Sequence, residues 1–256
     1  MDGARVRDRT KKKDEGGLWE TVKVVAQALL IALVVRTLLF QPFNIPSGSL
    51  IPTLLIGDYL FVSKYSYGYS RHSIPFSPPL ITGRVWGTEP RRGDIAVFKL
   101  PKDNATDYIK RVIGLPGDRV QVVDGTLQIN GKPVQRERIA DFRTEDPFGR
   151  VVEVARYRET LPEGASYAVI ERDGDRGFWD NTPVYMVPPG HYFMMGDNRD
   201  NSTDSRDEAS VGYVPYENFV GRAEIIFFSI EESASAWRIW EWPWTVRWER
   251  LFRPIN

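Results

Sequence analysis

The sequence contains no cysteine and only two histidines, His72 and His191. The lack of cysteine excludes a disulfide framework, a thiol nucleophile and a metal or cluster site built on thiolates. The scarcity of histidine excludes a histidine-rich metal site, and any Ser-His mechanism would have to use one of these two residues. His72 stands in a stretch rich in proline and serine, and His191 follows Pro189-Gly190, so both are typical of loop or strand-edge residues.

An excess of charge of either sign is also missing. Lys plus Arg number 34 and Asp plus Glu number 34, whereas a nucleic-acid-binding protein would carry a basic excess, so no nucleic-acid partner is expected. Apolar residues make up 42% and aromatic residues 12% of the 256 residues, which is enough to form the core of one large domain or two small ones. The sequence shows no internal repeat, no heptad pattern and no phosphate-cradling glycine loop.

One long hydrophobic run is present, at residues 18–43. Its apolar centre, residues 24–35, is interrupted by a single glutamine. This length matches the roughly 20 apolar residues that a spanning helix needs, and Lys23 and Arg36 near its ends can snorkel to the interface. We therefore predict a transmembrane anchor at residues 18–40.

Two other kinds of segment have a similar hydrophobic run. A cleavable secretory signal would also follow a basic N-terminal region, but no small-x-small cleavage motif comes after the run; Arg36, Phe40, Gln41 and Pro42 occupy that place. The buried helix of a soluble protein is the second alternative.

A basic cluster precedes the predicted anchor. Because basic residues beside a span stay in the cytoplasm, residues 1–17 are predicted to form a cytoplasmic tail and residues 41–256 an extracytoplasmic catalytic domain. A merely solvated, disordered tail would have the same composition. The cluster consists of Arg5, Arg7, Arg9, Lys11, Lys12 and Lys13.

The outer domain is predicted to be mainly β. Pro42 and Pro46 should end the helix and favour an extended passage, because proline removes a backbone donor and biases its predecessor away from helix. Residues 65–90, rich in Tyr, Ser, Pro and Gly, are typical of a long loop. Strands are expected at residues 60–62, 95–100, 108–113, 191–195 and 223–230.

Two further segments have a distinct composition. Residues from about 119 to 188 are predicted to be a β-rich insertion, because Asp124-Gly125 and Asn130-Gly131 are hairpin signals; residues 136–158 within it are charged and poorly patterned. Residues from about 233 to 256 hold five of the eight tryptophans, interleaved with arginine. Indole rings favour the membrane interface, so we predict a Trp-rich interfacial tail, with an aromatic segment folded back on the protein as the alternative.

Ser49, in the Pro- and Gly-containing stretch 46–53, is the candidate nucleophile. On the predicted strand 108–113, alternation places Lys110 on the face of Tyr108 and Val112, where burial would lower its pKa. To act as a base near neutrality this pKa must fall by about 3 units from 10.4, at a cost of about 4 kcal/mol, which a buried site can provide. The alternatives are an ordinary turn serine and a lysine that only pairs with an acid.

The run 196–206 contains no apolar residue. Its acids resemble a calcium loop only loosely, so no metal is expected. In the preferred interpretation Ser202 hydrogen-bonds Lys110. Two carboxylates of this run would then neutralise two arginines and form a rigid backing. The four supporting residues are Asp197, Asp204, Arg206 and Arg111.

Three separated blocks resemble type I signal peptidases (leader peptidases). They are PSGSLIPTLLIGDYLFVSKYSYG (46–68), RRGDIAVFKLP with DYIKRVIGLPGD (91–118), and MMGDNRDNSTDSR with GYVPYENFVGRA (194–223). The resemblance implies a signal-peptidase-type β domain behind one transmembrane helix. It also implies a membrane-bound serine endopeptidase that removes signal peptides from exported preproteins, without a cofactor, after small residues at −3 and −1.

The resemblance also implies roles for individual residues. Ser49 would be the nucleophile and Lys110 the general base; Ser47 would stabilise the oxyanion beside the Ser49 amide, and Ser202 would orient the lysine. An extended substrate would bind in a cleft with shallow pockets. The residues at matching positions are Phe43, Ile45, Leu50, Leu54, Val97, Asp107, Tyr108 and Ile109.

The pattern of this sequence departs from the family at two points. Leu50 replaces the usual methionine, a residue of similar volume, and the spacer 207–211 is longer than usual.

The expected location is a bacterial inner membrane, crossed once, with signal peptides and lipid as partners; transient contact with the export translocon is compatible with this location. The alternative functions are another Ser-Lys membrane peptidase such as a pilus-maturation enzyme, a self-cleaving repressor, and a non-enzymatic, membrane-tethered peptide-binding β domain.

Overall fold

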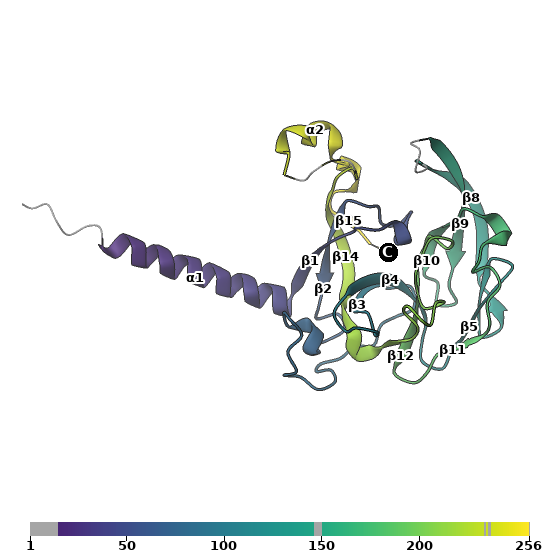
Figure 1. Cartoon of the computed structure of the whole chain (residues 1–256), viewed down its shortest axis with the longest axis horizontal. Coiled ribbons are helices and arrows are strands. Elements are labelled where there is room, and N and C mark those ends of the chain that lie inside the picture. The colour runs from purple at the N-terminus through teal and green to yellow at the C-terminus, as the bar shows by residue number, and fades with distance from the viewer. Residues whose placement is uncertain (1–14, 146–149, 233, 235–236, 256) are drawn as a thin grey trace, which may run out of the picture.

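The computed structural model describes residues 15–145, 150–232, 234 and 237–255. A single long helix precedes a β-rich body (Figure 1). The helices are α1 (Glu15–Leu38) and the short α2 (Trp242–Thr245). The strands are β1 (Phe40–Asn44), β2 (Asp58–Ser63), β3 (Ile95–Lys99), β4 (Asp107–Gly114), β5 (Arg119–Val123), β6 (Thr126–Ile129), β7 (Lys132–Pro133), β8 (Gln135–Glu145), β9 (Val151–Thr160), β10 (Ser166–Glu171), β11 (Tyr185–Met186), β12 (His191–Met195), β13 (Val214–Pro215), β14 (Phe219–Ser229) and β15 (Arg253–Pro254).

Helix α1 extends away from the body, and its apolar surface is not covered by protein (Figure 1). Its segment Gly17–Leu38 has 22 residues with a mean hydropathy of 1.9, which is long and apolar enough to cross a bilayer. Because this segment is 0% buried, the alternative of a buried soluble helix is wrong. The basic cluster of the predicted cytoplasmic tail lies outside the described residues.

After α1 the chain forms β1, which contains Pro42. Strand β1 pairs antiparallel with β2. Two hydrogen bonds join the end of the helix to the body: Lys64 N donates to Leu39 O at 2.9 Å, and the Tyr69 hydroxyl donates to Leu38 O at 2.7 Å. The predicted extended passage after the helix is therefore confirmed, and it forms the edge strand of the main sheet.

The main sheet has the strand order β1-β2-β14-β3-β4-β12-β13, with β15 added beside β14. All of its pairs are antiparallel, and the strands expected from the sequence are present. Apolar clusters cover both faces of this sheet; one contains Leu50, Leu60 and Val97, and the other contains Phe98 and Val112. The fold is mainly β, as predicted.

Residues 119–188, the segment predicted to be an insertion, contain strands β5 to β11 and lie on the side of the body opposite α1 (Figure 1). The first two turns of this segment are Asp124-Gly125, with φ of 46° and 69°, and Asn130-Gly131, with φ of 54° and 76°. Positive φ at both central residues is the geometry that Asp-Gly and Asn-Gly favour in hairpins, so both hairpin predictions are confirmed.

The charged segment 136–158, in which the sequence shows no clear strand pattern, lies mostly in the long hairpin of β8 and β9. Alternation is weak there because arginines take the place of apolar residues. The guanidinium carbons of Arg136 and Arg138 lie 3.7 and 5.2 Å from the ring centroid of Tyr157 on the facing strand. These cross-strand contacts stabilise a hairpin that hydrophobicity alone does not indicate.

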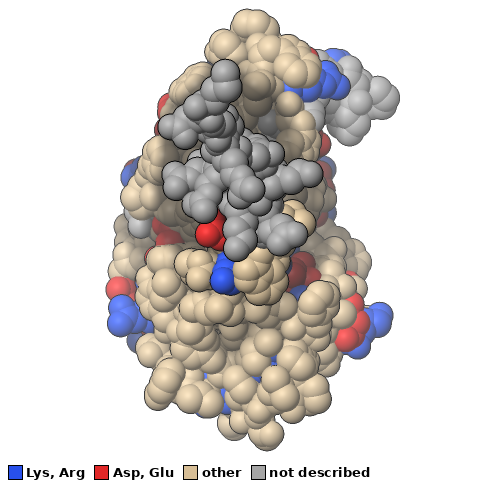
Figure 2. Space-filling view, turned by 90° about the vertical axis from the view of Figure 1, so that its left-hand side faces the viewer, with Lys and Arg blue, Asp and Glu red and all other residues tan. Residues whose placement is uncertain are grey.

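Two irregular segments lie outside the sheets. The predicted loop at 65–90 contains no strand of the main sheets, and it exposes Phe76, Leu80 and Trp86. Figure 2 looks along α1 towards the body, and the part of this face below the grey atoms carries few charged side chains.

Near the C-terminus, Trp242 packs on Phe228 with ring centroids 5.1 Å apart. The tail's exposed tryptophans are Trp237, Trp240, Trp244 and Trp248.

Candidate active site

The candidate nucleophile lies in a short 3-10 helix, Gly48–Leu50, which follows Ser47 in extended conformation. The neighbouring Leu50 is buried in the core and anchors this turn, while Ser49 itself is 7% exposed. Ser47 Oγ lies 3.5 Å from Ser49 Oγ. The Ser49 N–H belongs to the first turn of the helix, where backbone donors have no acceptor within the helix.

Asn198 holds this turn from the other side. Its side-chain Nδ2 donates to Gly48 O at 3.0 Å, and its backbone N donates to Ser49 O at 3.1 Å. The sequence analysis did not predict a role for Asn198, because only the carboxylates, the arginine and the serine of the polar run were assigned functions. An amide inside a run of acids is the signal that could have indicated it, since an amide can donate to backbone carbonyls and a carboxylate cannot.

Lys110 lies directly beside Ser49. Its Nζ donates to Ser49 Oγ at 2.7 Å and to Ile109 O at 3.2 Å, and the side chain is 4% exposed. The Nζ also lies 5.3 Å from the ring centroid of Tyr108, on the same strand. Strand β4 therefore delivers the buried lysine to the serine, which lies 61 residues earlier in the chain.

The environment of Lys110 shifts its pKa downward to about 8, mainly because burial disfavours the ammonium ion. The charges of Asp204 and Asp197 oppose this shift, and Arg206 adds to it. A lysine with such a pKa is partly neutral close to neutral pH and can accept a proton.

The next residue on β4 forms a fully buried ion pair. Arg111 Nε and Nη2 donate to the two oxygens of Asp197, both at 2.8 Å. The Thr53 hydroxyl donates to Asp197 Oδ2 at 2.5 Å, so this carboxylate also binds the segment just after the nucleophile turn. The structure thus brings together β4, the nucleophile segment and the polar run around one acid.

A second buried pair joins Asp204 and Arg206, with Nε and Nη2 of the arginine 2.9 and 2.8 Å from the carboxylate oxygens. Burial alone would raise the pKa of Asp204, but Arg206 and the hydrogen bond from Gly196 N hold it below its ordinary value. All four predicted supporting residues therefore lie in two ion pairs behind the serine and the lysine.

Ser202 does not make the hydrogen bond that the sequence predicts. It lines the same pocket as Ser49 and Lys110, but the Lys110 ammonium donates to Ser49 and Ile109 instead. Within the described residues the buried Ser202 Oγ has no hydrogen-bond partner of full geometry, although it lies near enough to Asp204 to help lower that pKa. The close approach of Ser202 needs glycine at 196, because a Cβ there would lie 2.2 Å from Ser202 Oγ.

A pocket of about 540 Å³ opens in front of the serine and the lysine. Three of the residues proposed to bind substrate, Asp107, Tyr108 and Ile109, line it. These residues pair with β3 on one edge, but β12 ends at Met195, opposite Arg111, so their other edge has no strand partner among the described residues. That edge offers backbone groups to an extended peptide.

The other residues proposed to line the cleft are not part of this pocket's lining. They belong to one apolar cluster of the core or pack against it. These residues are Phe43, Ile45, Leu50, Leu54 and Val97. The pocket lining that sequence reasoning missed consists of Pro46, Gly48, Trp179, Asp200, Asn201 and Thr203.

Neither histidine lines this pocket. Burial, with the charge of Arg71, lowers the pKa of His72 to about 4, so its ring is neutral at pH 7. His191 Nδ1 lies 2.9 Å from Pro189 O at the start of β12. No group of three or more His, Asp or Glu side chains in the described ranges could hold a metal ion.

Comparison with known proteins gives consistent results. A family model described as signal peptidase, peptidase S26, matches residues 18–228. Signal peptidase I of Rickettsia akari is 38% identical over 277 aligned positions, covering 100% of this chain and 98% of the relative. Signal peptidase I of Rickettsia typhi is 44% identical over 212 positions, covering 78% of this chain and 76% of the relative.

Among solved structures, a signal peptidase I from Enterococcus faecalis is 26% identical and aligns with a TM-score of 0.30, covering 53% of this chain and 97% of that chain. The family match spans more than half of the chain, and the Rickettsia akari relative is matched over nearly its whole length. The chain therefore belongs to the type I signal peptidases, a family of serine endopeptidases.

Proposed function

We propose that this chain cleaves signal peptides from exported preproteins with a Ser49–Lys110 dyad. The observation that carries the proposal is the 2.7 Å hydrogen bond between Lys110 Nζ and Ser49 Oγ in a buried setting. Neutral Lys110 takes the proton of Ser49 Oγ while the oxygen bonds to the carbonyl carbon of the substrate. The carbonyl electrons then form an oxyanion.

The oxyanion is stabilised by the Ser49 N–H and the Ser47 hydroxyl, which lies 3.5 Å from the nucleophile. When the oxyanion collapses, the C–N bond breaks and the Lys110 ammonium gives its proton to the departing amine. A water molecule then attacks the acyl-enzyme, Lys110 accepts the proton of that water, and Ser49 Oγ recovers a proton as it leaves.

The supporting residues act through these two side chains. The pairs Arg111–Asp197 and Asp204–Arg206 fix the strand and loop behind the dyad, and Asn198 positions the serine turn. Ser202 lines the pocket beside Lys110 without a hydrogen bond to it. The substrate lies extended along the open edge of Asp107, Tyr108 and Ile109. Small residues at −3 and −1 fit the shallow floor, because fully buried core residues lie beneath it and leave little depth.

The proposed topology places α1 across a bacterial inner membrane with its N-terminus in the cytoplasm. Its apolar surface, 0% buried by the protein, supports this placement. The domain from residue 41 onward then faces outward, where export substrates arrive. The exposed tryptophans near the C-terminus are placed at the lipid interface.

The decisive experiment measures cleavage of a signal-bearing precursor by the full chain in detergent micelles. Ser49→Ala and Lys110→Ala should each reduce the rate by roughly 10²–10⁴-fold, because each removes a group that acts in the transition state. Ser166→Ala and Lys132→Ala are matched controls at exposed positions of the insertion. If either dyad variant kept the rate of its control, the proposed mechanism would be wrong.

A further inference from the structure

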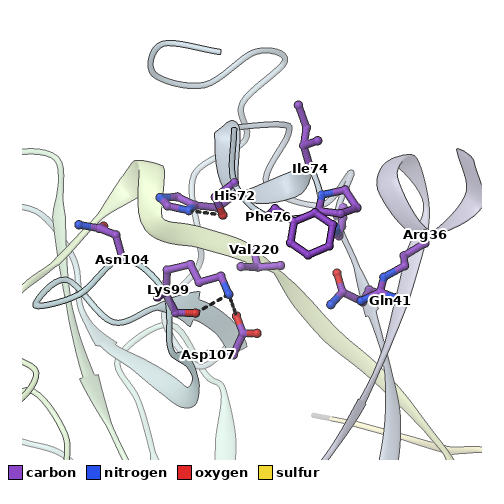
Figure 3. A pocket seen from close by; sticks show the side chains of 13 residues that line it. Arg36, Gln41, His72, Ile74, Phe76, Lys99, Asn104, Asp107 and Val220 are labelled. Carbon is purple, nitrogen blue, oxygen red and sulfur yellow. Dashed lines mark hydrogen bonds and ion pairs between the residues drawn. The ribbon is translucent and has the colours of Figure 1, made fainter. Parts of the chain in front are cut away.

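A second pocket, of about 340 Å³, lies at the outer end of α1. Arg36 of α1 and Gln41 of β1 line one side, and Lys99 lies on another (Figure 3). Asp107 is the one lining residue that this pocket shares with the candidate active site. The two pockets are therefore neighbours that open separately.

The lining of this pocket carries an excess of positive charge. Three cationic side chains, Arg36, Lys64 and Lys99, face a single carboxylate, that of Asp107. Lys99 Nζ pairs with Asp107 at 2.9 Å. His72 adds no charge at pH 7 because its pKa is about 4. An excess of two positive charges remains, on Arg36 and Lys64.

Lys64 is the unusual member of this set. It is 2% exposed, and its Nζ donates to the carbonyl of Ser73. No carboxylate among the described residues lies within ion-pair distance of Lys64 or Arg36. Burial, with the nearby charge of Arg36, lowers the pKa of Lys64 to about 8. A buried ammonium without a counter-ion is unfavourable, and an anion placed between Lys64 and Arg36 would offset that cost.

The position of the pocket indicates the source of such an anion. Arg36 is in the last turn of α1, and Lys64 N binds Leu39 O just beyond the helix. A helix of 22 residues is about 33 Å long, close to the ~30 Å thickness of the hydrocarbon core. With α1 across a bilayer, the pocket lies at the level of the outer phosphate groups. The fully exposed ring of Phe76 lies at its rim, where it can contact acyl chains.

We propose that this pocket binds the phosphodiester of an anionic phospholipid in the outer leaflet, between Arg36 and Lys64. The inference rests on the membrane topology given under the proposed function. The bound lipid fixes the height and tilt of the catalytic domain, because the pocket joins the end of α1 to the strands that carry the active site. Its apolar rim and its place at the helix end favour a lipid over free phosphate.

The test measures lipid binding by the full-length chain in nanodiscs or detergent, by native mass spectrometry and titration. The wild type should bind phosphatidylglycerol about tenfold more tightly than phosphatidylcholine, because a charge-assisted contact is lost with the neutral headgroup. Lys64→Met, which keeps the buried volume, should remove this preference, and Arg36→Gln should reduce it. Lys132→Gln, at an exposed position of the insertion, is the matched control and should behave as the wild type.

The outcomes separate this inference from the proposed function. Ser49→Ala should bind phosphatidylglycerol as the wild type does, even though it no longer cleaves precursor. If Lys64→Met still preferred phosphatidylglycerol over phosphatidylcholine as the wild type does, the lipid site would be overturned. Displacement of the lipid by inorganic phosphate at a similar concentration would also overturn it, because that result would indicate a site for free phosphate. Release of the chain from membranes by alkaline extraction would overturn the topology itself.

Discussion

Two buried lysines, Lys110 and Lys64, have nearly the same degree of burial and both have a pKa lowered to about 8. Their neighbours differ. Lys110 faces a hydroxyl, whereas Lys64 faces a carbonyl. Among their charged neighbours, Asp204 and Asp197 outweigh Arg206 at Lys110, whereas Arg36 outweighs Asp107 at Lys64. A proton can leave Ser49 for Lys110, but a carbonyl has no proton to give. A lowered pKa therefore identifies a catalytic lysine only when an acidic hydrogen lies beside it.

The largest difference between the two lysines is expected when a charged neighbour of each is removed. Asp197→Asn should lower the free energy of unfolding by about 3–5 kcal/mol, because it leaves the buried Arg111 guanidinium without its carboxylate. Arg36→Gln should change it by less than about 0.5 kcal/mol, because Arg36 is exposed and makes no ion pair with a described residue. Denaturant titration of both variants in the same detergent measures the difference. Equal effects would show that the acids behind Lys110 have no special structural role.

The second prediction concerns pH. With a pKa of about 8, the neutral fraction of Lys110 falls from about one half at pH 8 to about one hundredth at pH 6, so the precursor cleavage rate should fall roughly fiftyfold over this range. The sign follows from the base role, because protonation on the acid side removes the acceptor for the Ser49 proton. The same profile recorded for Lys64→Met should keep its midpoint. A rate that is flat across this range would contradict the assignment of Lys110.

The smallest effect is expected at the far wall of the active-site pocket. Trp179, from the insertion, lines this pocket, and its ring lies 5.6 Å from the guanidinium carbon of Arg206. Trp179→Ala should raise KM for a precursor by a few-fold, about 1 kcal/mol or less, with a smaller change in kcat. Its neighbour Phe178 is largely exposed and does not line the pocket, so Phe178→Ala is the matched control. Equal KM values for the two variants would exclude the insertion from substrate binding.

The parts of the fold that sequence predicts well depend on local signals. The hairpins at Asp124-Gly125 and Asn130-Gly131 follow from the positive φ values that these residues tolerate. Helix α1 ends at Leu38, before Pro42, in line with the expectation that the prolines exclude further helix. The long hairpin of residues 135–160 is not visible in the sequence, because its cross-strand contacts join arginine to tyrosine and leave no apolar alternation.

In the candidate site, too, residues marked by a local pattern could be predicted and residues placed by distant contacts could not. Ser49 and Lys110 could be proposed because cysteine is absent and histidine scarce, because alternation on β4 buries the lysine, and because both residues lie in blocks that resemble type I signal peptidases. The sequence could not predict the roles of Asn198, Trp179 or the Lys64 pocket, because each depends on contacts between distant segments. The apolar residues that the family resemblance assigns to the cleft, such as Leu54 and Val97, lie in the buried core, and their contact with substrate stays a prediction.

The hydrogen bonds from Lys64 N and the Tyr69 hydroxyl to the end of α1 have a consequence for which bond is cut. Ser49 is only a short stretch of chain beyond Leu38, and half of that stretch is the paired strand β1. With α1 in a bilayer, the nucleophile is held at a set depth relative to the lipid surface. If α1 crosses a bilayer as proposed, we expect a precursor to be cut at the small residue that reaches this depth when its own hydrophobic segment lies in the membrane.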